Sequence, residues 1–160
     1  MSYHYTLCGL DNIYLTNGVD EHQTEYGDGV SIQNADDLDT AIALAVISLP
    51  YRLQGQDLRF LRSLLDLSQK ELADRLGTQR VTIARWEGKP YTPITGSADR
   101  LLRFYCSERL FAGACSAALT DLLPEIDEGK RPRIEMGHVK SGVNAISSNK
   151  KFHWEARRTA

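Results

Sequence analysis

The spacing of apolar and polar residues changes along the chain, and each change predicts a different kind of element. Up to about residue 33, short β-rich runs are separated by turn signals. Ile13–Leu15 is predicted to be a strand, and Asn17-Gly18 and Asp28-Gly29 are dipeptides that favour hairpin turns. We therefore expect strands and turns in this first part of the chain.

Residues 36–48 have the spacing of a helix with one apolar face. Asp36 or Asp37 is suited to cap its N-terminus, and Pro50 cannot continue it. Together with the preceding strands, this helix predicts a small strand-turn-helix unit over residues 1–50. The helical residues expected to face inward are Leu38, Ile42, Leu44, Ala45 and Ile47.

Between residues 55 and 110 the pattern predicts helices only. One helix begins at Ser68, because Ser68 and Glu71 match the Ser-x-x-Glu capping box, and it ends at Gly77, a residue suited to the left-handed position. Thr78 is then predicted to cap a second helix that runs to about residue 87. The residues expected to anchor this second helix in the core are Ile83 and Trp86.

The C-terminal part is predicted as a helix and a strand followed by a tail. Residues 114–123 have helical spacing, and residues 131–138 alternate as in a short strand. Residues 113–139 are candidates for a dimerisation segment, and the apolar face of a helix predicted over residues 97–110 is the alternative. Residues 140–160 are rich in Ser, Asn, Gly and Lys and predict a flexible basic tail, in which Phe152 and Trp154 are the exceptions that could dock.

Charge is distributed unevenly along the chain. Residues 1–49 hold eight acidic side chains and no Lys or Arg, whereas residues 50–110 hold eleven Lys or Arg and seven acidic side chains. A basic middle segment suits a polyanion such as DNA. An acidic first segment suits a basic partner protein.

The two helices joined by Gly77 have the features of a DNA-binding helix-turn-helix. The second helix must offer a polar face without carboxylates to the major groove, and residues 78–86 contain no Asp or Glu. Arginine pairs with guanine, glutamine with adenine, and valine with a thymine methyl group. The alternative is a plain helical hairpin with a solvated face. The residues predicted to bind DNA are Gln69, Thr78, Gln79, Arg80, Val81, Thr82, Arg85 and Lys89.

This segment resembles the Xre/Cro-type helix-turn-helix family over roughly residues 55–110. The resemblance implies a compact helical domain that acts as a dimer on a palindromic operator, with Gln69 on the DNA backbone. It is carried by Leu58-Arg59-x2-Arg62-x2-Leu65-x-Leu67-Ser68-Gln69-x-Glu71-Leu72-Ala73-x2-Leu76-Gly77 and by Ile83-x2-Trp86-Glu87.

A looser resemblance, to the MqsA-like antitoxins, covers residues 1–110. It rests on a Cys-Gly-Leu start, the helix-turn-helix and Arg85 ahead of Trp86-Glu87, and it implies a zinc-binding N-terminal unit. Zinc of that kind needs paired Cys-x-x-Cys motifs or an equivalent cluster. Here Cys8 is alone, with His4 and His22 as the nearby imidazoles. We therefore expect this unit to fold without metal.

The resulting prediction is an α+β fold. It comprises an acidic N-terminal α+β unit (1–50), an all-α lambda-repressor-like helix-turn-helix domain (51–112), a helix and strand extension (113–139) and the tail (140–160). No nucleophile elbow, P-loop or dinucleotide fingerprint is present, so neither catalysis nor a cofactor is expected. Three unpaired cysteines, no secretory signal and no long apolar run predict a cytoplasmic protein that does not bind membranes.

Two functions follow from these features. The first is a sequence-specific transcriptional regulator that binds double-stranded DNA as a homodimer and represses its own operon. The helix of residues 78–87 from each protomer would contact the bases of a palindromic operator. The second is an antitoxin-like interaction protein. It would neutralise a partner such as a basic toxin through residues 1–50, and its DNA binding would serve autoregulation.

Overall fold

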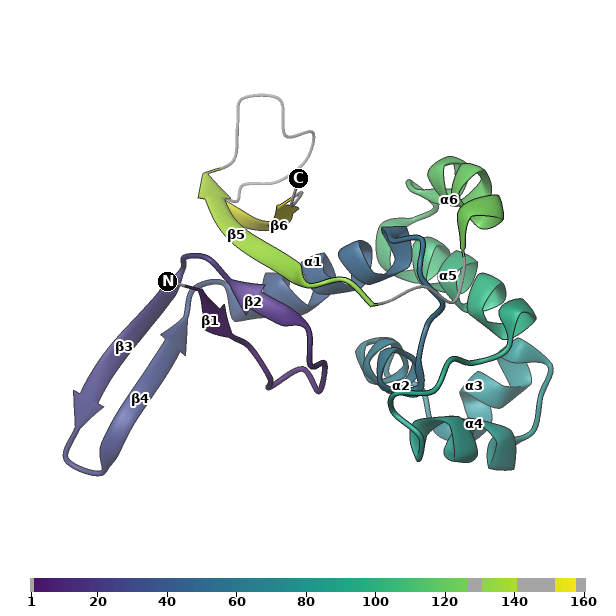
Figure 1. The fold of residues 1–160 in the computed structure, drawn as a ribbon, viewed down its shortest axis with the longest axis horizontal. Helices are drawn as coiled ribbons and strands as arrows, with labels where there is room; N and C mark the ends of the chain where they lie inside the picture. Colours follow the sequence, from purple (N-terminus) through teal and green to yellow (C-terminus); the bar gives the residue numbers. More distant parts are fainter. Residues whose placement is uncertain (1, 127–130, 141–151, 158–160) are drawn as a thin grey trace.

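The central pair of strands in the main sheet comes from opposite ends of the chain (Figure 1). The computed structural model describes residues 2–126, 131–140 and 152–157. Strand β2 (Ile13–Leu15) pairs in parallel with β5 (Ile134–Lys140), opposing Ile13 to Ile134. The antiparallel strands β1 (Tyr3–His4) and β6 (Phe152–Arg157) complete the order β1-β2-β5-β6. The predicted units 1–50, 113–139 and 140–160 therefore contribute to one sheet.

Strand β6 corrects the prediction of a flexible tail for part of residues 140–160. Residues 152–157 pair with β5, and Trp154 is 4% exposed beneath helix α1. The indole Nε1 of Trp154 donates to the Gln33 carbonyl at 2.8 Å. A polar composition does not prevent strand formation where one aromatic side chain can be buried. The remainder of the predicted tail, residues 141–151 and 158–160, lies outside the described residues.

The predicted hairpin turns are wrong in position. Strands β3 (Val19–Thr24) and β4 (Gly27–Ile32) form a separate hairpin, and the chain after Asn17-Gly18 leaves β2 instead of returning along it. Asp28-Gly29 lies within β4, and the turn is at residues 25–26. The Thr24 hydroxyl stabilises this turn, because it donates to the Gly27 carbonyl at 2.6 Å and accepts from the Tyr26 amide at 3.3 Å. That threonine is a weaker sequence signal than Asp-Gly.

Helix α1 (Ala35–Ser48) confirms the helix predicted for residues 36–48, with two corrections. Asn34, in the left-handed conformation, precedes the helix, and Asp36 and Asp37 lie in its first turn, where the helix dipole favours carboxylates. Leu44 is 40% exposed, although it was expected to face inward. Both the sheet and the helical domain contact α1, and Leu44 borders an open hollow between them that is also lined by Phe111 and Trp154.

The helical domain lies beside the sheet and follows the predicted order (Figure 1). It contains α2 (Gly55–Leu64), α3 (Gln69–Leu76), α4 (Arg80–Glu87) and α5 (Gly96–Phe111). Helix α6 (Ser116–Leu122) and the 3-10 helix η1 (Leu123–Glu125) follow it. One apolar cluster runs from this domain to the sheet, and it includes Leu58, Leu72, Ile83, Leu102, Ile42, Leu15 and Met136. None of the helices in the described ranges is long and apolar enough to cross a bilayer.

Candidate nucleic-acid interface

Local hydrogen bonds determine where α3 begins and ends. The Ser68 hydroxyl accepts from the Glu71 amide at 3.1 Å, and the Glu71 carboxylate accepts from the Ser68 amide at 2.7 Å. This confirms the predicted capping box, and the hydrogen bond from the Ser68 amide lowers the pKa of Glu71. Gly77 ends the helix at φ 66°, in the left-handed region where a residue without Cβ is unstrained.

The next helix begins one residue later than predicted. Thr78 is not its cap, because the Thr78 amide donates to the Ala73 carbonyl at 3.0 Å and so completes the turn after α3. Gln79 occupies the N-cap position of α4 without a side-chain capping bond. Thr78 is therefore half-buried in the turn, and the helical part of the predicted site begins at Arg80.

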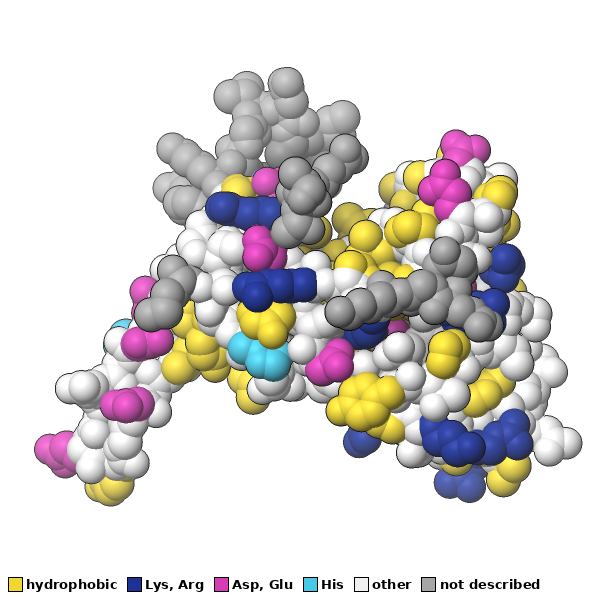
Figure 2. Space-filling view, in the orientation of Figure 1, with side chains coloured by type: hydrophobic (Ala, Val, Ile, Leu, Met, Phe, Trp, Pro, Cys, Tyr) yellow, Lys and Arg dark blue, Asp and Glu magenta, His cyan; other side chains and the backbone are white. Residues whose placement is uncertain are grey.

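Helix α4 is buried on one side and exposed on the other. Ile83 is fully buried and Trp86 packs partly against the core, as the sequence predicts. Thr82 is half-buried at the edge of the exposed side. Lys and Arg side chains gather over α3 and α4, on the part of the molecule farthest from the acidic hairpin (Figure 2). The exposed predicted residues on or next to α4 are Gln79, Arg80, Val81, Arg85 and Lys89.

A charged cluster that the sequence analysis missed joins α2, α3 and α4. The Glu87 carboxylate at the end of α4 accepts from Arg62 Nε at 2.5 Å and from Arg62 Nη2 at 3.0 Å. The Gln69 side-chain amide donates to the same carboxylate at 3.0 Å. In this structure the Gln69 amide helps to hold α3 against α4, and its contact with the DNA backbone stays a prediction. The sequence signal for this ion pair was one charged residue on the otherwise apolar face of each helix, Arg62 in α2 and Glu87 in α4.

Backbone atoms of α2 and of the segment after α4 approach each other closely at Gly55. A Cβ atom on Gly55 would lie 2.0 Å from the Trp86 carbonyl oxygen and 2.7 Å from the Lys89 carbonyl oxygen. The Gln56 amide donates to the Pro90 carbonyl at 3.1 Å. The first turn of α2 therefore supports the C-terminal end of α4 directly.

A buried arginine fixes the linker between α1 and α2 to α5. Arg103 is fully buried and pairs with Asp99, with 2.7 Å between Nε and Oδ1. Its guanidinium also donates to the carbonyls of Ile47, at 2.9 Å, and Leu49, at 2.8 Å. The position of this arginine in the sequence, four residues after an aspartate within an apolar helix, is consistent with an internal ion pair.

Two of the residues considered for zinc, His4 and Cys8, are in surroundings that do not favour metal binding. His4 Nε2 lies 2.9 Å from the Asp11 carbonyl oxygen, and the His4 ring stacks on Tyr14. Burial raises the pKa of the Cys8 thiol to about 11, which disfavours the thiolate that would bind metal. Over the part of the chain that the structure describes, no three His, Cys, Asp or Glu side chains converge. A metal-free N-terminal unit stays a prediction.

Comparison with known families identifies the helical segment. Residues 58–97 match the family model described as helix-turn-helix, which extends from α2 into the start of α5. The chain therefore carries an Xre/Cro-like helix-turn-helix domain, a DNA-binding unit of transcriptional regulators. Comparisons with curated proteins and with solved structures found no match.

Proposed function

We propose that this protein is a sequence-specific repressor that binds a palindromic operator as a homodimer, including the operator of its own operon. The observation that carries the proposal is the exposed side of α4. It presents Arg80, Val81 and Arg85 to solvent while Ile83 is buried, and Gln79 precedes it. The exposed side of α4 therefore has hydrogen-bond donors and an apolar contact suited to base edges. The one carboxylate of the helix, Glu87, is largely buried and paired with Arg62.

The roles of the individual residues follow from their chemistry. Arg80 and Arg85 would each donate two hydrogen bonds to a guanine, and Gln79 would pair with an adenine. Thr82 lies at the edge of the exposed side of α4, and Lys89 follows the C-terminus of that helix. A phosphate contact at either position would orient the helix. Two copies of α4 would enter successive major grooves, so the half-site centres would lie about 34 Å apart or at a multiple of that distance. The protein would act by binding, without catalysis.

A binding titration on DNA upstream of the protein's own gene tests this function. At fixed salt, Arg85→Ala should weaken binding to the specific site about 5- to 150-fold, equivalent to about 1–3 kcal/mol. Arg109→Ala is the matched control, because Arg109 is an exposed arginine at the far end of α5. Unchanged binding by Arg85→Ala, or an equal loss in both variants, would contradict the assignment of α4 as the recognition helix.

The homodimer is tested separately by light scattering during size-exclusion chromatography. A mass twice that of the 17.9 kDa chain is expected at the concentrations at which the operator is bound. A monomer that occupies both half-sites independently would contradict this part of the proposal.

The hairpin β3–β4 favours a second candidate function, an antitoxin-like protein that neutralises a basic partner. The hairpin extends away from the body of the protein (Figure 1) and carries acidic side chains (Figure 2). Tyr26 at its turn is 98% exposed. Isolated two-stranded hairpins have little stability in water, so a partner that covers this one would stabilise it. Its acidic residues are Asp20, Glu21, Glu25 and Asp28.

Co-expression with a small basic protein encoded next to this gene tests the second function. If the second function is correct, the basic protein alone stops growth and the wild-type protein restores it. A variant with Glu21→Gln, Glu25→Gln and Asp28→Asn should not restore growth, although it should still bind the operator. Equal growth with both proteins would contradict a role for the hairpin in neutralisation.

A further inference from the structure

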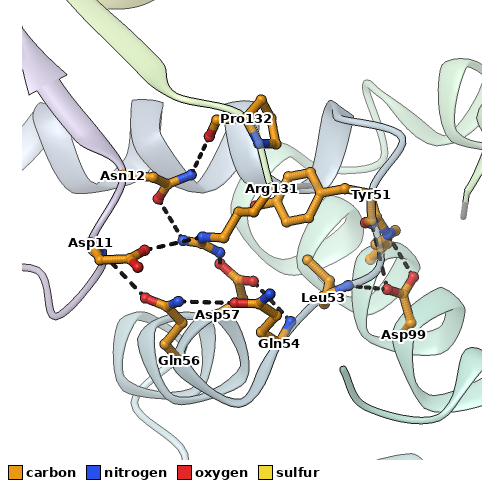
Figure 3. Close-up of polar contacts among 11 residues, drawn as sticks. Asp11, Asn12, Tyr51, Leu53, Gln54, Gln56, Asp57, Asp99, Arg131 and Pro132 are labelled. Atoms are coloured by element: carbon orange, nitrogen blue, oxygen red, sulfur yellow. Dashed lines mark hydrogen bonds and ion pairs between the residues drawn. The ribbon is translucent and has the colours of Figure 1, made fainter. Parts of the chain in front are cut away.

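Arg131 joins three separate parts of the chain through its buried side chain (Figure 3). The side chain is 8% exposed, and each of its nitrogens has its own acceptor. Nε lies 3.2 Å from Asp11 Oδ1, Nη1 lies 2.6 Å from Asp57 Oδ1, and Nη2 lies 2.5 Å from Asn12 Oδ1. The guanidinium also lies over the Tyr51 ring, 5.5 Å from its centre.

On one side of Arg131 is the first turn of α2. The Asp57 side chain is fully buried, and its Oδ2 accepts from the Gln54 amide at 2.9 Å, which caps the helix. Burial raises the pKa of Asp57, and the positive charge of Arg131 opposes that shift. Without Arg131, the capping carboxylate would be a buried charge without its counter-ion, which is strongly unfavourable.

On the other side is the loop before β2, which is bound to the segment that leads into β5. The Asn12 side chain donates to the Pro132 carbonyl at 2.6 Å, and the Asn12 carbonyl accepts from the Ile134 amide at 2.8 Å. The Asp11 amide donates to the Gln56 side chain at 3.2 Å. Arg131 therefore connects α2 to the sheet.

The same turn of α2 supports the recognition helix. Gly55 packs against the carbonyls of Trp86 and Lys89, and Gln56 is bonded to Pro90. Arg103 already attaches the α1–α2 linker to α5. Apolar packing also joins the helical domain to the sheet, but it is not directional, whereas hydrogen-bonded ion pairs fix an orientation. Arg131 adds such a directional contact at α2, beside the hydrogen bond between Asp11 and Gln56, one helical turn from α4.

We propose that Arg131 is a positioning residue for operator recognition, which sets the orientation of α4 relative to the sheet and thereby the half-site spacing that the dimer accepts. The inference rests on the proposed dimeric function, with the dimer contact on β5, the strand that falls largely within the predicted dimerisation segment 113–139. In such a dimer the sheet is the common frame of both recognition helices. Spacing preference then measures how rigidly each α4 is held to that frame.

The test measures affinity for duplexes whose two half-sites are moved apart in steps of one base pair, and for a single half-site. Each step rotates one half-site by about 34–36° around the duplex, since a turn takes about 10–10.5 base pairs. Arg131→Met should bind the single half-site within about twofold of wild type. Its preference for the best spacing over the neighbouring spacings should fall at least tenfold.

Two further variants make this result specific. Arg133→Met removes the same charge two residues away, from a side chain that is 49% exposed, and should keep the wild-type spacing profile. Asp57→Asn leaves an oxygen to cap α2 but removes the ion pair, and should reproduce the effect of Arg131→Met. A wild-type spacing profile in Arg131→Met, or an equal loss on single and paired half-sites, would overturn the proposal.

A measurement on the free protein separates this inference from the proposed function. Spin labels at Lys70→Cys on α3 and Glu155→Cys on β6, in a Cys8→Ser and Cys115→Ser background, report one intramolecular distance when the labelled protein is diluted into unlabelled protein. Arg131→Met should broaden or shift the distance distribution, and Arg133→Met should not. An unchanged distribution would overturn the role of Arg131. If the wild-type protein shows no preference for one half-site spacing, while Arg131→Met still changes the distance distribution, the result would instead contradict the proposed dimeric operator.

Discussion

The Arg62 guanidinium donates to the Glu87 carboxylate through two nitrogens, and so joins α2 to the last residue of α4. Both side chains are largely buried, at 17% and 7% exposed. A third bond from Arg62 Nη1 to the Leu67 carbonyl, at 2.9 Å, includes the turn before α3. The angle between the helices of the DNA-binding motif therefore depends on an ion pair as well as on apolar packing.

Glu87→Ala should lower the free energy of unfolding by about 2–3 kcal/mol, because it leaves Arg62 largely buried without its counter-ion. Urea denaturation at neutral pH measures this loss. Asp74→Ala is the matched control. It breaks the exposed Lys70–Asp74 pair, which should contribute no more than about 0.5 kcal/mol. An equally small effect in both variants would show that the Arg62–Glu87 pair does not stabilise the domain.

Gly55→Ala should lower stability by at least about 1–3 kcal/mol, and DNA affinity with it. Its Cβ would lie 2.0 Å from the Trp86 carbonyl oxygen, so α2 and α4 must move apart. Gly88→Ala is the comparison, since its nearest new contact is 3.4 Å, within ordinary packing. Thermal melting and operator titration of both variants measure the difference. A Gly55→Ala protein as stable as Gly88→Ala would refute the close approach.

Acidification should weaken the N-terminus of α3. The pKa of Glu71 is lowered from its ordinary value of 4.5 in the folded protein, so folding favours the ionised carboxylate. Its contribution is present above that ordinary value and is lost as the pH falls through the lower folded-state pKa. Wild type should therefore lose more stability than Glu71→Gln between about pH 5 and pH 3. Parallel losses in urea denaturation at each pH would contradict this.

Cys106 should resist thiol reagents in the native protein. Its side chain is fully buried, and burial raises the pKa of the thiol to about 12, so thiolate is scarce at neutral pH. Mass spectrometry after alkylation at pH 8 should find Cys106 modified only as fast as the protein unfolds. Modification under native conditions at the rate of a small free thiol would show that the packing around α5 opens readily.

The best-predicted parts of the molecule are those whose causes lie within a few residues. The Ser68–Glu71 capping box, Gly77 and the inward spacing of Ile83 and Trp86 define α3 and α4 locally. The errors arose where a local signal had a non-local competitor. Asn17-Gly18 turns the chain without forming a hairpin, because β2 pairs with β5 instead of β3. Trp154 orders a strand in a predicted tail, because it is buried beneath α1.

The sequence by itself determined the helix-turn-helix and the residues it can offer to DNA, because helix spacing, caps and turn glycines act between near neighbours. Only the tertiary structure decided how that domain is held. Arg131 meets Asp57 across 74 residues of chain, and Gly55 meets Trp86 across 31. These contacts depend on chain segments that folding brings together, and the buried charge of Asp57 acquires its partner only when the β5 segment returns to the sheet.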